Sequence, residues 1–373
     1  MIYLDYAANT PVCEEVLKIF AEVSRDYTAN PNSPHTLGMR AKNKLDECTG
    51  QIKQLLQAPG YEVVYTSGAS ESNNLAIKGA AKKLRHAGKH IITTYLEHSS
   101  VNGAMEYLAG EGFEVDYVDI TRDGLVDTEH LRELLRKDTV LVSICCVDSE
   151  IGLRQEISRI GGILSERPGC IFHVDATQAV GKIPVSLDHV DLLTFAPHKF
   201  YGLNGCGVLL KKQNIFLEPL IHGGISTTPY RSGTPALGLI ASTAKALELA
   251  AAGMEKNYLY AEGLNKYLRD SLGRFPQIRI NSTAASVPFI LNISIPGMNT
   301  GLLQAELDKM GVCLSTKSAC CAPASVSRPV YALTRDKKAA LATLRISLSH
   351  LTAREEIDIF LEKFSDCLHK LAK

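Results

Sequence analysis

The sequence predicts an α/β fold, with a mostly parallel sheet covered by helices on both faces, followed by a smaller α+β section. Short runs rich in Val and Ile alternate with helical patterns through the middle of the chain, which is typical of a sheet buried on both faces. From about Leu237 a long helix rich in Ala and Leu replaces this alternation. The length of 373 residues is sufficient for two ordinary domains with sizeable cores.

Local patterns predict the individual elements in order. Apolar runs predict strands at 62–66, 90–94, 113–118, 139–143, 170–174, 192–195 and 207–210. Helical periodicity predicts helices over 70–85, after His98 with Ser99 and Ser100 as caps, over 127–136 and over 237–272. The last section predicts strands at 289–294, 312–315 and 344–348 and helices near 301–310 and from about 353. The first fifteen residues are predicted to be extended and to join this section.

Composition narrows the class of protein. Hydrophobic residues make up 45% of the chain, charged residues 21%, and the formal net charge is zero, so neither nucleic acid nor a membrane is expected as a partner. The N-terminal residues lack the basic region of a signal peptide. Ten cysteines without such a signal indicate free thiols in a reducing compartment, and we expect a cytoplasmic protein. Without a Cys-x-x-Cys pair or a Cys/His cluster at zinc spacing, no metal site is expected.

Two short motifs carry most of the chemical information. The segment 173–178 closes one predicted strand with Asp175, and the segment 196–199 follows the next strand with Lys199. An acid and a lysine beyond the carboxyl ends of strands are what a pyridoxal phosphate (PLP) site needs. The lysine would bind the aldehyde as a Schiff base, and the carboxylate would pair with the pyridinium nitrogen. Each motif by itself fits a solvated loop equally well.

Four other features could complete such a site, and each has a plainer interpretation. The strand-to-helix junction at 66–72 could cradle a phosphate or be an ordinary N-cap. His98 could stack on a cofactor ring or face solvent. Thr234 precedes a proline and could face an anion or simply cap a helix. Arg345 lies in an apolar strand, where it needs either a substrate carboxylate or a structural salt bridge.

Two adjacent thiols, Cys320 and Cys321, lie in a loop of small residues after an apolar strand, with Lys317 nearby. We predict that this loop is exposed and mobile and that its thiols are candidates for reactivity. Five other cysteines are predicted to be inert small hydrophobes: Cys48, Cys170, Cys206, Cys313 and Cys367.

Taken together, the motifs form an ordered set that spans essentially the whole chain: 3–8, 66–74, 97–98, 173–178, 198–199, 231–234, 318–320 and Arg345. The set resembles the cysteine desulfurases, which are class-V aminotransferase-like, fold-type I PLP enzymes. The resemblance implies a large PLP-binding domain over 16–256 with a mostly parallel seven-stranded sheet. It also implies a small domain formed by 1–15 and 257–373. The long stretch after Cys320 resembles the branch with an extended cysteine loop, which serves iron–sulfur cluster assembly and tRNA thiolation.

The same resemblance implies an activity and a set of roles. The enzyme would convert L-cysteine to L-alanine and pass the sulfur, as a persulfide on Cys320, to an acceptor protein. Lys199 would be the Schiff-base lysine and Asp175 the partner of the pyridine nitrogen. The remaining implied contacts are Gln178 with the phenolic oxygen, His98 stacked on the ring, Ser70 and His198 on the phosphate, Ala69 and Ser149 on the cofactor, Thr234 on the phosphate of the partner subunit in a homodimer, and Arg345 with Asn30 on the substrate.

Three departures from the family pattern keep other functions open. The chain has Asp148-Ser149-Glu150 where the family usually has Asn-Asn-Glu, and Ala196 where the family has Ser. Near the nucleophile, Lys317 replaces a Gly and Cys321 replaces a Thr. The alternatives are a selenocysteine lyase or other class-V lyase, and a catalytically weak sulfur-relay or scaffold protein. The sequence does not name the sulfur acceptor or the role of Cys321.

Overall fold

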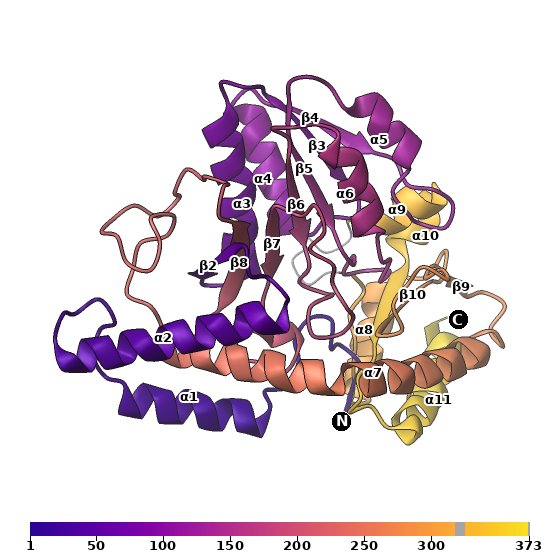
Figure 1. The fold of residues 1–373 in the computed structure, drawn as a ribbon. Helices are drawn as coiled ribbons and strands as arrows, with labels where there is room; N and C mark the ends of the chain where they lie inside the picture. Colours follow the sequence, from indigo (N-terminus) through magenta and orange to yellow (C-terminus); the bar gives the residue numbers. More distant parts are fainter. Residues whose placement is uncertain (318–324, 372–373) are drawn as a thin grey trace.

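The computed structural model describes residues 1–317 and 325–371 and confirms the α/β class (Figure 1). A central sheet of seven strands has the order β2-β8-β7-β6-β5-β3-β4. Strand β8 runs antiparallel to both of its neighbours, and the other neighbouring pairs of this sheet are parallel. The strands are β2 (Tyr61–Thr66), β3 (His90–Thr94), β4 (Glu114–Val118), β5 (Thr139–Cys145), β6 (Ile171–Asp175), β7 (Leu192–Phe195) and β8 (Gly207–Lys212).

Helices cover both faces of this sheet because its side chains alternate between two apolar cores. Ile91, for example, belongs to the core beneath α3 and α4, while Ile92 belongs to the core on the opposite face. The helices of the first 272 residues are α1 (Glu14–Asp26), α2 (Thr36–Leu55), α3 (Ala69–Leu84), α4 (Ser99–Gly110), α5 (Thr128–Leu134), α6 (Ile157–Ser165) and α7 (Leu237–Leu272), with a short 3₁₀ turn over Pro197–Lys199.

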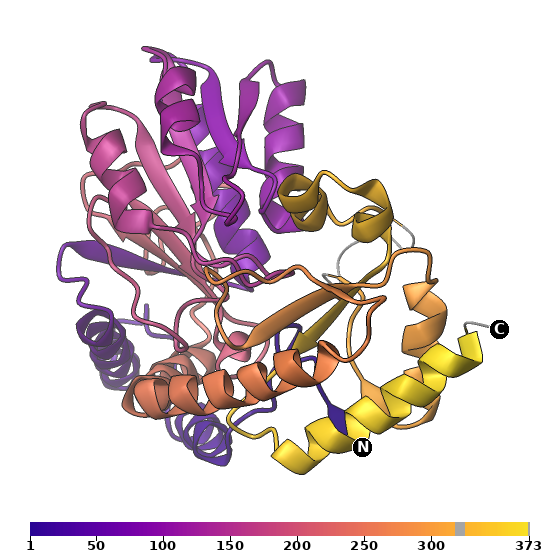
Figure 2. The same ribbon diagram turned by 90° about the vertical axis from the view of Figure 1, so that its right-hand side faces the viewer.

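A smaller unit is built on two further sheets, and the N-terminal strand belongs to one of them. In Figure 2 this strand lies close to the C-terminal helix, and Leu4 shares an apolar core with Phe360. The antiparallel sheet has the order β12-β10-β9, and β1 pairs in parallel with β11. The elements of this unit are β1 (Ile2–Tyr3), β9 (Arg279–Ile280), β10 (Ile290–Ser294), α8 (Thr300–Lys309), β11 (Val312–Cys313), α9 (Arg328–Thr334), α10 (Lys337–Leu341), β12 (Thr343–Ser347) and α11 (Arg354–Leu371).

Helix α7 connects the two units. Its first half packs in the core of the central sheet, together with α1 and α2, and its last turns pack in the small unit. By length and composition it is the one helix among the described residues that could cross a membrane, but more than half of its most apolar stretch is buried. Such burial is typical of a core helix. The expected domain boundary between 256 and 257 falls inside α7 and stays a prediction.

The structure differs from the sequence prediction mainly in helices. The patterns did not indicate α1, α2, α6, α9 or α10. Helices α9 and α10 occupy much of the stretch between Cys320 and Arg345, which no local pattern indicated. The cap of α4 also differs, because the His98 side chain itself accepts a hydrogen bond from the backbone N–H of Ser100.

A close backbone contact between β8 and the end of β2 should tolerate only glycine at position 207. A Cβ added to Gly207 would lie 2.3 Å from the carbonyl carbon of Gly68 and 2.5 Å from Oγ1 of Thr66. We expect Gly207→Ala to lower the free energy of unfolding by about 1–3 kcal/mol in chemical denaturation, since overpacking forces backbone shifts. Gly68→Ala is the matched control, because a Cβ there meets no atom within 4 Å. Equal stability of the Gly207→Ala variant and the unmodified protein would contradict this contact.

Candidate active site

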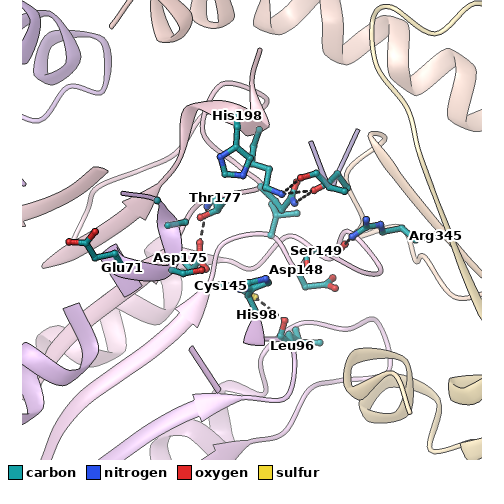
Figure 3. A pocket seen from close by; sticks show the side chains of 18 of the residues that line it. Glu71, Leu96, His98, Cys145, Asp148, Ser149, Asp175, Thr177, His198 and Arg345 are labelled. Carbon is teal, nitrogen blue, oxygen red and sulfur yellow. Dashed lines mark hydrogen bonds between the residues drawn. The ribbon is translucent and has the colours of Figure 1, made fainter. Parts of the chain in front are cut away.

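One cavity of about 380 Å³ lies where strands of the central sheet end, beside the small unit (Figure 3). The segments that follow β2, β3, β5, β6 and β7 all contribute to it. Because the carboxyl ends of parallel strands meet at one edge of a sheet, residues far apart in sequence converge there. The cavity brings together these predicted site residues: Ala69, Ser70, His98, Ser149, Asp175, Gln178, His198, Lys199 and Arg345.

Asp175 ends β6 as a buried carboxylate with an ordered set of partners. Its Oδ2 accepts a hydrogen bond from Nδ2 of Asn73 at 2.8 Å, and its Oδ1 accepts from the backbone N–H of Thr177 at 2.9 Å. Asn73 is also buried, and its Nδ2 contacts Oγ of Ser100 at 3.0 Å. Each carboxylate oxygen has two lone pairs, so Asp175 is held in place and can still accept a further donor.

Lys199 contacts the N-terminal segment. Its Nζ donates to the backbone carbonyl oxygens of Ala7 at 2.9 Å and Ala8 at 2.6 Å. The Ala7 carbonyl also accepts from Nε2 of Gln178 at 2.8 Å, and Oε1 of Gln178 accepts from Nζ of Lys182 at 2.8 Å. The N-terminal segment therefore holds both the candidate reactive lysine and the neighbouring amide.

Arg345 is buried, and its guanidinium is partly satisfied within the protein. Its Nη2 donates to Oδ1 of Asp5 at 2.8 Å and its Nη1 to the backbone carbonyl of Ser149 at 2.9 Å. The Nε atom has no partner among the described residues. The structural salt bridge considered from sequence is therefore present, and the arginine also faces the cavity, where it could bind a carboxylate.

The ring of His98 has a defined tautomer. Its Nδ1 accepts from the backbone N–H of Ser100 at 3.2 Å, which assigns the proton of the neutral ring to Nε2. The neighbouring residue, Glu97, is buried, and its Oε1 accepts from the backbone N–H of Cys145 and from Oγ1 of Thr94, each at 2.8 Å. Burial, opposed by these hydrogen bonds and reinforced by the charge of Asp175, raises the pKa of Glu97 to about 8.

Burial and neighbouring positive charges lower the pKa of two further basic groups near the site. Burial and the charges of Lys199 and Arg345 lower the pKa of Lys182 to about 7. Burial, followed by the charges of Lys199 and Lys182, lowers the pKa of His198 to about 4, so its ring is neutral at physiological pH. Mutual repulsion between cations in a partly buried space means that an anionic ligand would lower the electrostatic energy of this cavity.

The start of helix α3 forms one wall of the cavity and suits a phosphate. Gly68, Ala69 and Ser70 all line the cavity at this helix N-terminus, where backbone N–H groups lack partners within the helix. Glu71 accepts from the backbone N–H of Ser67 at 2.7 Å and pairs with Arg231 at 2.9 Å, which ties the turn to the loop before α7.

Two of the sequence-predicted residues lie outside this cavity. Asn30 and Thr234 line a separate cavity between the end of α1, the loop that follows it, and the start of α7. Cys320, like Cys321, lies outside the described residues. At the base of that segment, Nζ of Lys317 donates to the backbone carbonyl of Ser325 at 2.6 Å and to its Oγ at 2.9 Å.

The structure also places residues at the site that local sequence patterns did not indicate. Asp5, Ala7 and Ala8 carried the resemblance to a family, but no local pattern indicated that they would reach the site. Cys145 lines the cavity, where burial raises its pKa well above the usual range, so it is not a thiolate. Across residues 1–317 and 325–371, no group of three His, Cys, Asp or Glu side chains could hold a metal ion.

Comparison with known proteins identifies the family. The model of the aminotransferase class-V family matches residues 2–360. The chain belongs to the class-V aminotransferase family. Cysteine desulfurase IscS of Dictyoglomus turgidum is 35% identical over 99% of this chain and 95% of its own length. IscS of Pseudoalteromonas translucida is 38% identical over 99% of this chain and 93% of its own length. A solved NifS-like protein has a TM-score of 0.92 at 32% identity and covers 99% of this chain and 100% of its own.

Members of the class-V family that are cysteine desulfurases depend on PLP, and this cavity fits that cofactor. Oγ1 of Thr177, a residue that lines the cavity, is buried and has no partner among the described residues. Asp175 offers a buried carboxylate, Lys199 a primary amine, and the start of α3 a set of backbone donors. Together they match the pyridine nitrogen, the aldehyde and the phosphate of PLP.

The buried carboxyl of Glu97 should make the stability of this class-V protein depend on pH. In the folded chain it keeps its proton up to about pH 8, whereas in the unfolded chain Glu titrates near ~4.3. Between these values the folded state holds more protons, so the contribution of Glu97 to the free energy of unfolding falls as pH rises. We expect Glu97→Gln to gain stability relative to the unmodified protein from about pH 5 to pH 8 and to level off above.

Urea denaturation at several pH values measures this difference. The control is Glu111→Gln, an exposed glutamate directly after α4, the helix that Glu97 precedes. Its stability relative to the unmodified protein should not change with pH in this way. A stability difference for Glu97→Gln that does not change with pH would rule out a protonated Glu97.

Proposed function

We propose that this chain is an L-cysteine desulfurase that binds PLP at Lys199 and transfers the sulfur of L-cysteine, as a persulfide on Cys320, to an acceptor protein. The observation that carries the proposal is the convergence of Lys199, Asp175, His98 and Arg345 on one cavity from four separate segments. These residues supply an amine, a buried carboxylate, an aromatic base and a receptor for a carboxylate. A PLP-dependent reaction on an amino acid needs all four groups.

When bound, PLP supplies an electron sink for negative charge that develops at the Cα atom of an amino acid. The buried Asp175 keeps the proton on the pyridine nitrogen, and Gln178 would face the phenolic oxygen. His98 would lie against the ring, with its Nε2–H available as a donor. Ala69, Ser70, Ser149 and His198 line the same cavity and would complete the binding site.

The substrate would be held by its carboxylate. Arg345 already carries one carboxylate, that of Asp5, and its Nε atom has no partner among the described residues. We propose that the carboxylate of L-cysteine binds this guanidinium, which aims Cα at the amine of Lys199. Lys199 would remove the Cα proton at Nζ, and the carbonyls of Ala7 and Ala8 would stabilise the resulting ammonium.

The sulfur step involves only thiol chemistry on the protein. The Cys320 thiolate would attack the substrate sulfur, so that a sulfur–sulfur bond forms and the bond between Cβ and sulfur breaks. The electron pair of that bond passes to Cβ, which takes up a proton to give L-alanine. Cys320 is left as a persulfide, which the acceptor protein collects by thiol exchange.

The proposal also covers the oligomeric state, the cellular location and the sulfur acceptor. We propose that the enzyme is a cytoplasmic homodimer in which Thr234 contacts the phosphate in the partner subunit. Asn30, which lines the same separate cavity, would contact the substrate. The acceptor would belong to iron–sulfur cluster assembly or to tRNA thiolation. Selenocysteine lyase chemistry would use the same residues around the cofactor. The intact set of Lys199, Asp175 and Arg345 argues against a catalytically weak scaffold.

Replacement of Lys199 tests the assignment of the site. We expect Lys199→Ala to lose the visible absorbance of the protein-bound cofactor and to reduce L-alanine formation from L-cysteine by more than about a thousandfold, because the covalent anchor and the base are removed together. The assay measures alanine and sulfide with and without candidate acceptors. Alanine production by this variant at the unmodified rate would disprove the assignment.

Replacement of the two adjacent thiols tests the sulfur step. We expect Cys320→Ser to abolish alanine formation while PLP binding and the spectral change on addition of L-cysteine persist. Cys321→Ser should form the first persulfide at an unchanged rate and at most slow its onward transfer, because Cys320 is the proposed nucleophile. Mass spectrometry under non-reducing conditions after one turnover locates the added sulfur. Full turnover in Cys320→Ser, with sulfur on Cys321, is the contrary outcome.

A further inference from the structure

Lys182 is a cation next to the active site that the reaction proposed above does not use. It lies in the turn after β6, four residues beyond Gln178, and it is half-buried. Its Nζ donates to Oε1 of Gln178 at 2.8 Å. Burial, followed by the nearby charges of Lys199 and Arg345, disfavours its own charge. The charged form of Lys182 is therefore stabilised by specific hydrogen bonds, such as the one to Gln178.

Lys182 is the first member of a chain of hydrogen bonds that ends at Lys199. Gln178 accepts from Lys182 at one end of its amide and donates from Nε2 to the carbonyl of Ala7 at 2.8 Å at the other. The Ala7 carbonyl also accepts from Nζ of Lys199 at 2.9 Å. Gln178 is only 5% exposed, so water has little access to replace either partner.

The chemistry of the partners gives the amide a single orientation. A side-chain amide has a donor end and an acceptor end, which a half-turn about its last bond exchanges. An ammonium group can only donate, and the carbonyl of Ala7 can only accept. Between Lys182 and Ala7, Gln178 can satisfy both partners only with Oε1 toward the lysine. Without Lys182, this oxygen would be buried without a partner, which is costly.

We propose that Lys182 is a positioning residue, which fixes the amide orientation of Gln178 and, through the shared carbonyl of Ala7, the position of Lys199. Its consequence for the cofactor rests on the proposed PLP contacts of Gln178 and Lys199. The hydrogen bonds themselves are present without any cofactor, so they can be tested independently of the reaction.

The experiment is a double-mutant cycle of Lys182→Met and Gln178→Leu, first in apo protein by chemical denaturation and then by the dissociation constant of PLP. We expect Lys182→Met alone to weaken PLP binding about tenfold, the scale of one lost hydrogen bond to a charged group. It should also shift the pH titration of the visible band. In the Gln178→Leu background, Lys182→Met should weaken binding less than about twofold, since the partner is already absent.

Two further variants separate positioning from general damage. Lys182→Arg keeps a donor and should recover most of the PLP affinity. Lys211→Met removes a buried lysine of β8 that pairs with Glu62 and does not line the cavity; it should lower stability and leave PLP affinity unchanged. If Lys182→Met does not fold, Lys182→Gln, which retains an uncharged donor, replaces it, and its PLP affinity is compared with that of Lys182→Arg.

Equal losses of PLP affinity from Lys182→Met in the unmodified protein and in the Gln178→Leu variant would overturn the proposal, as would no loss at all. The proposed function fails in a different way. An unmodified protein that binds PLP and shows the coupling, yet forms no alanine from L-cysteine, would refute desulfuration and leave the role of Lys182 in place.

Discussion

The site depends on hydrogen bonds between the N-terminal segment and residues at the edge of the central sheet. The carbonyls of Ala7 and Ala8 hold the ammonium of Lys199, about 190 residues away in sequence. Two residues earlier, Asp5 pairs with Arg345 of the small unit. Because these contacts lie within a few residues of one turn at the N-terminus, the candidate base and the candidate carboxylate receptor are held at a mutual distance that this turn determines. Neither the central sheet nor the small unit could define that distance alone.

Burial then decides which ionisable groups carry charge. The carboxyl of Glu97 is close enough to Asp175 to feel its charge, and its pKa of about 8 makes it neutral near physiological pH. His198 is neutral too, with a pKa of about 4. The cavity thus presents Asp175 beside Lys199 and Arg345, a pattern suited to a ligand that carries a phosphate, a protonated ring nitrogen and a carboxylate. Glu97 and Asp175 carry the same functional group, yet burial keeps Glu97 neutral beside the Asp175 carboxylate.

The cysteines illustrate the same principle. Cys145 lines the active-site cavity, yet burial and the carboxylates around it raise its pKa well above the usual range. Burial likewise raises the pKa of Cys146 to about 12. A thiol without an ionised form is a poor nucleophile, so proximity to the cavity does not make either residue a sulfur acceptor. The proposed sulfur step accordingly relies on Cys320, whose segment begins and ends at the contact between Lys317 and Ser325.

The sequence by itself determined the α/β class, most strands of the central sheet and the line of polar residues at their carboxyl ends. Strands such as 90–94 and 192–195 are local patterns of apolar residues, and the direction of parallel strands places Asp175, His98 and Lys199 at one edge. Only the tertiary structure brought Asp5, Ala7 and Lys182 to the site, because backbone carbonyls and long-range hydrogen bonds leave no local pattern. It also separated Thr234 and Asn30 from the main cavity and formed α9 and α10, which no local pattern had indicated. Those outcomes depend on how distant segments pack, and short-range periodicity carries no information about such packing.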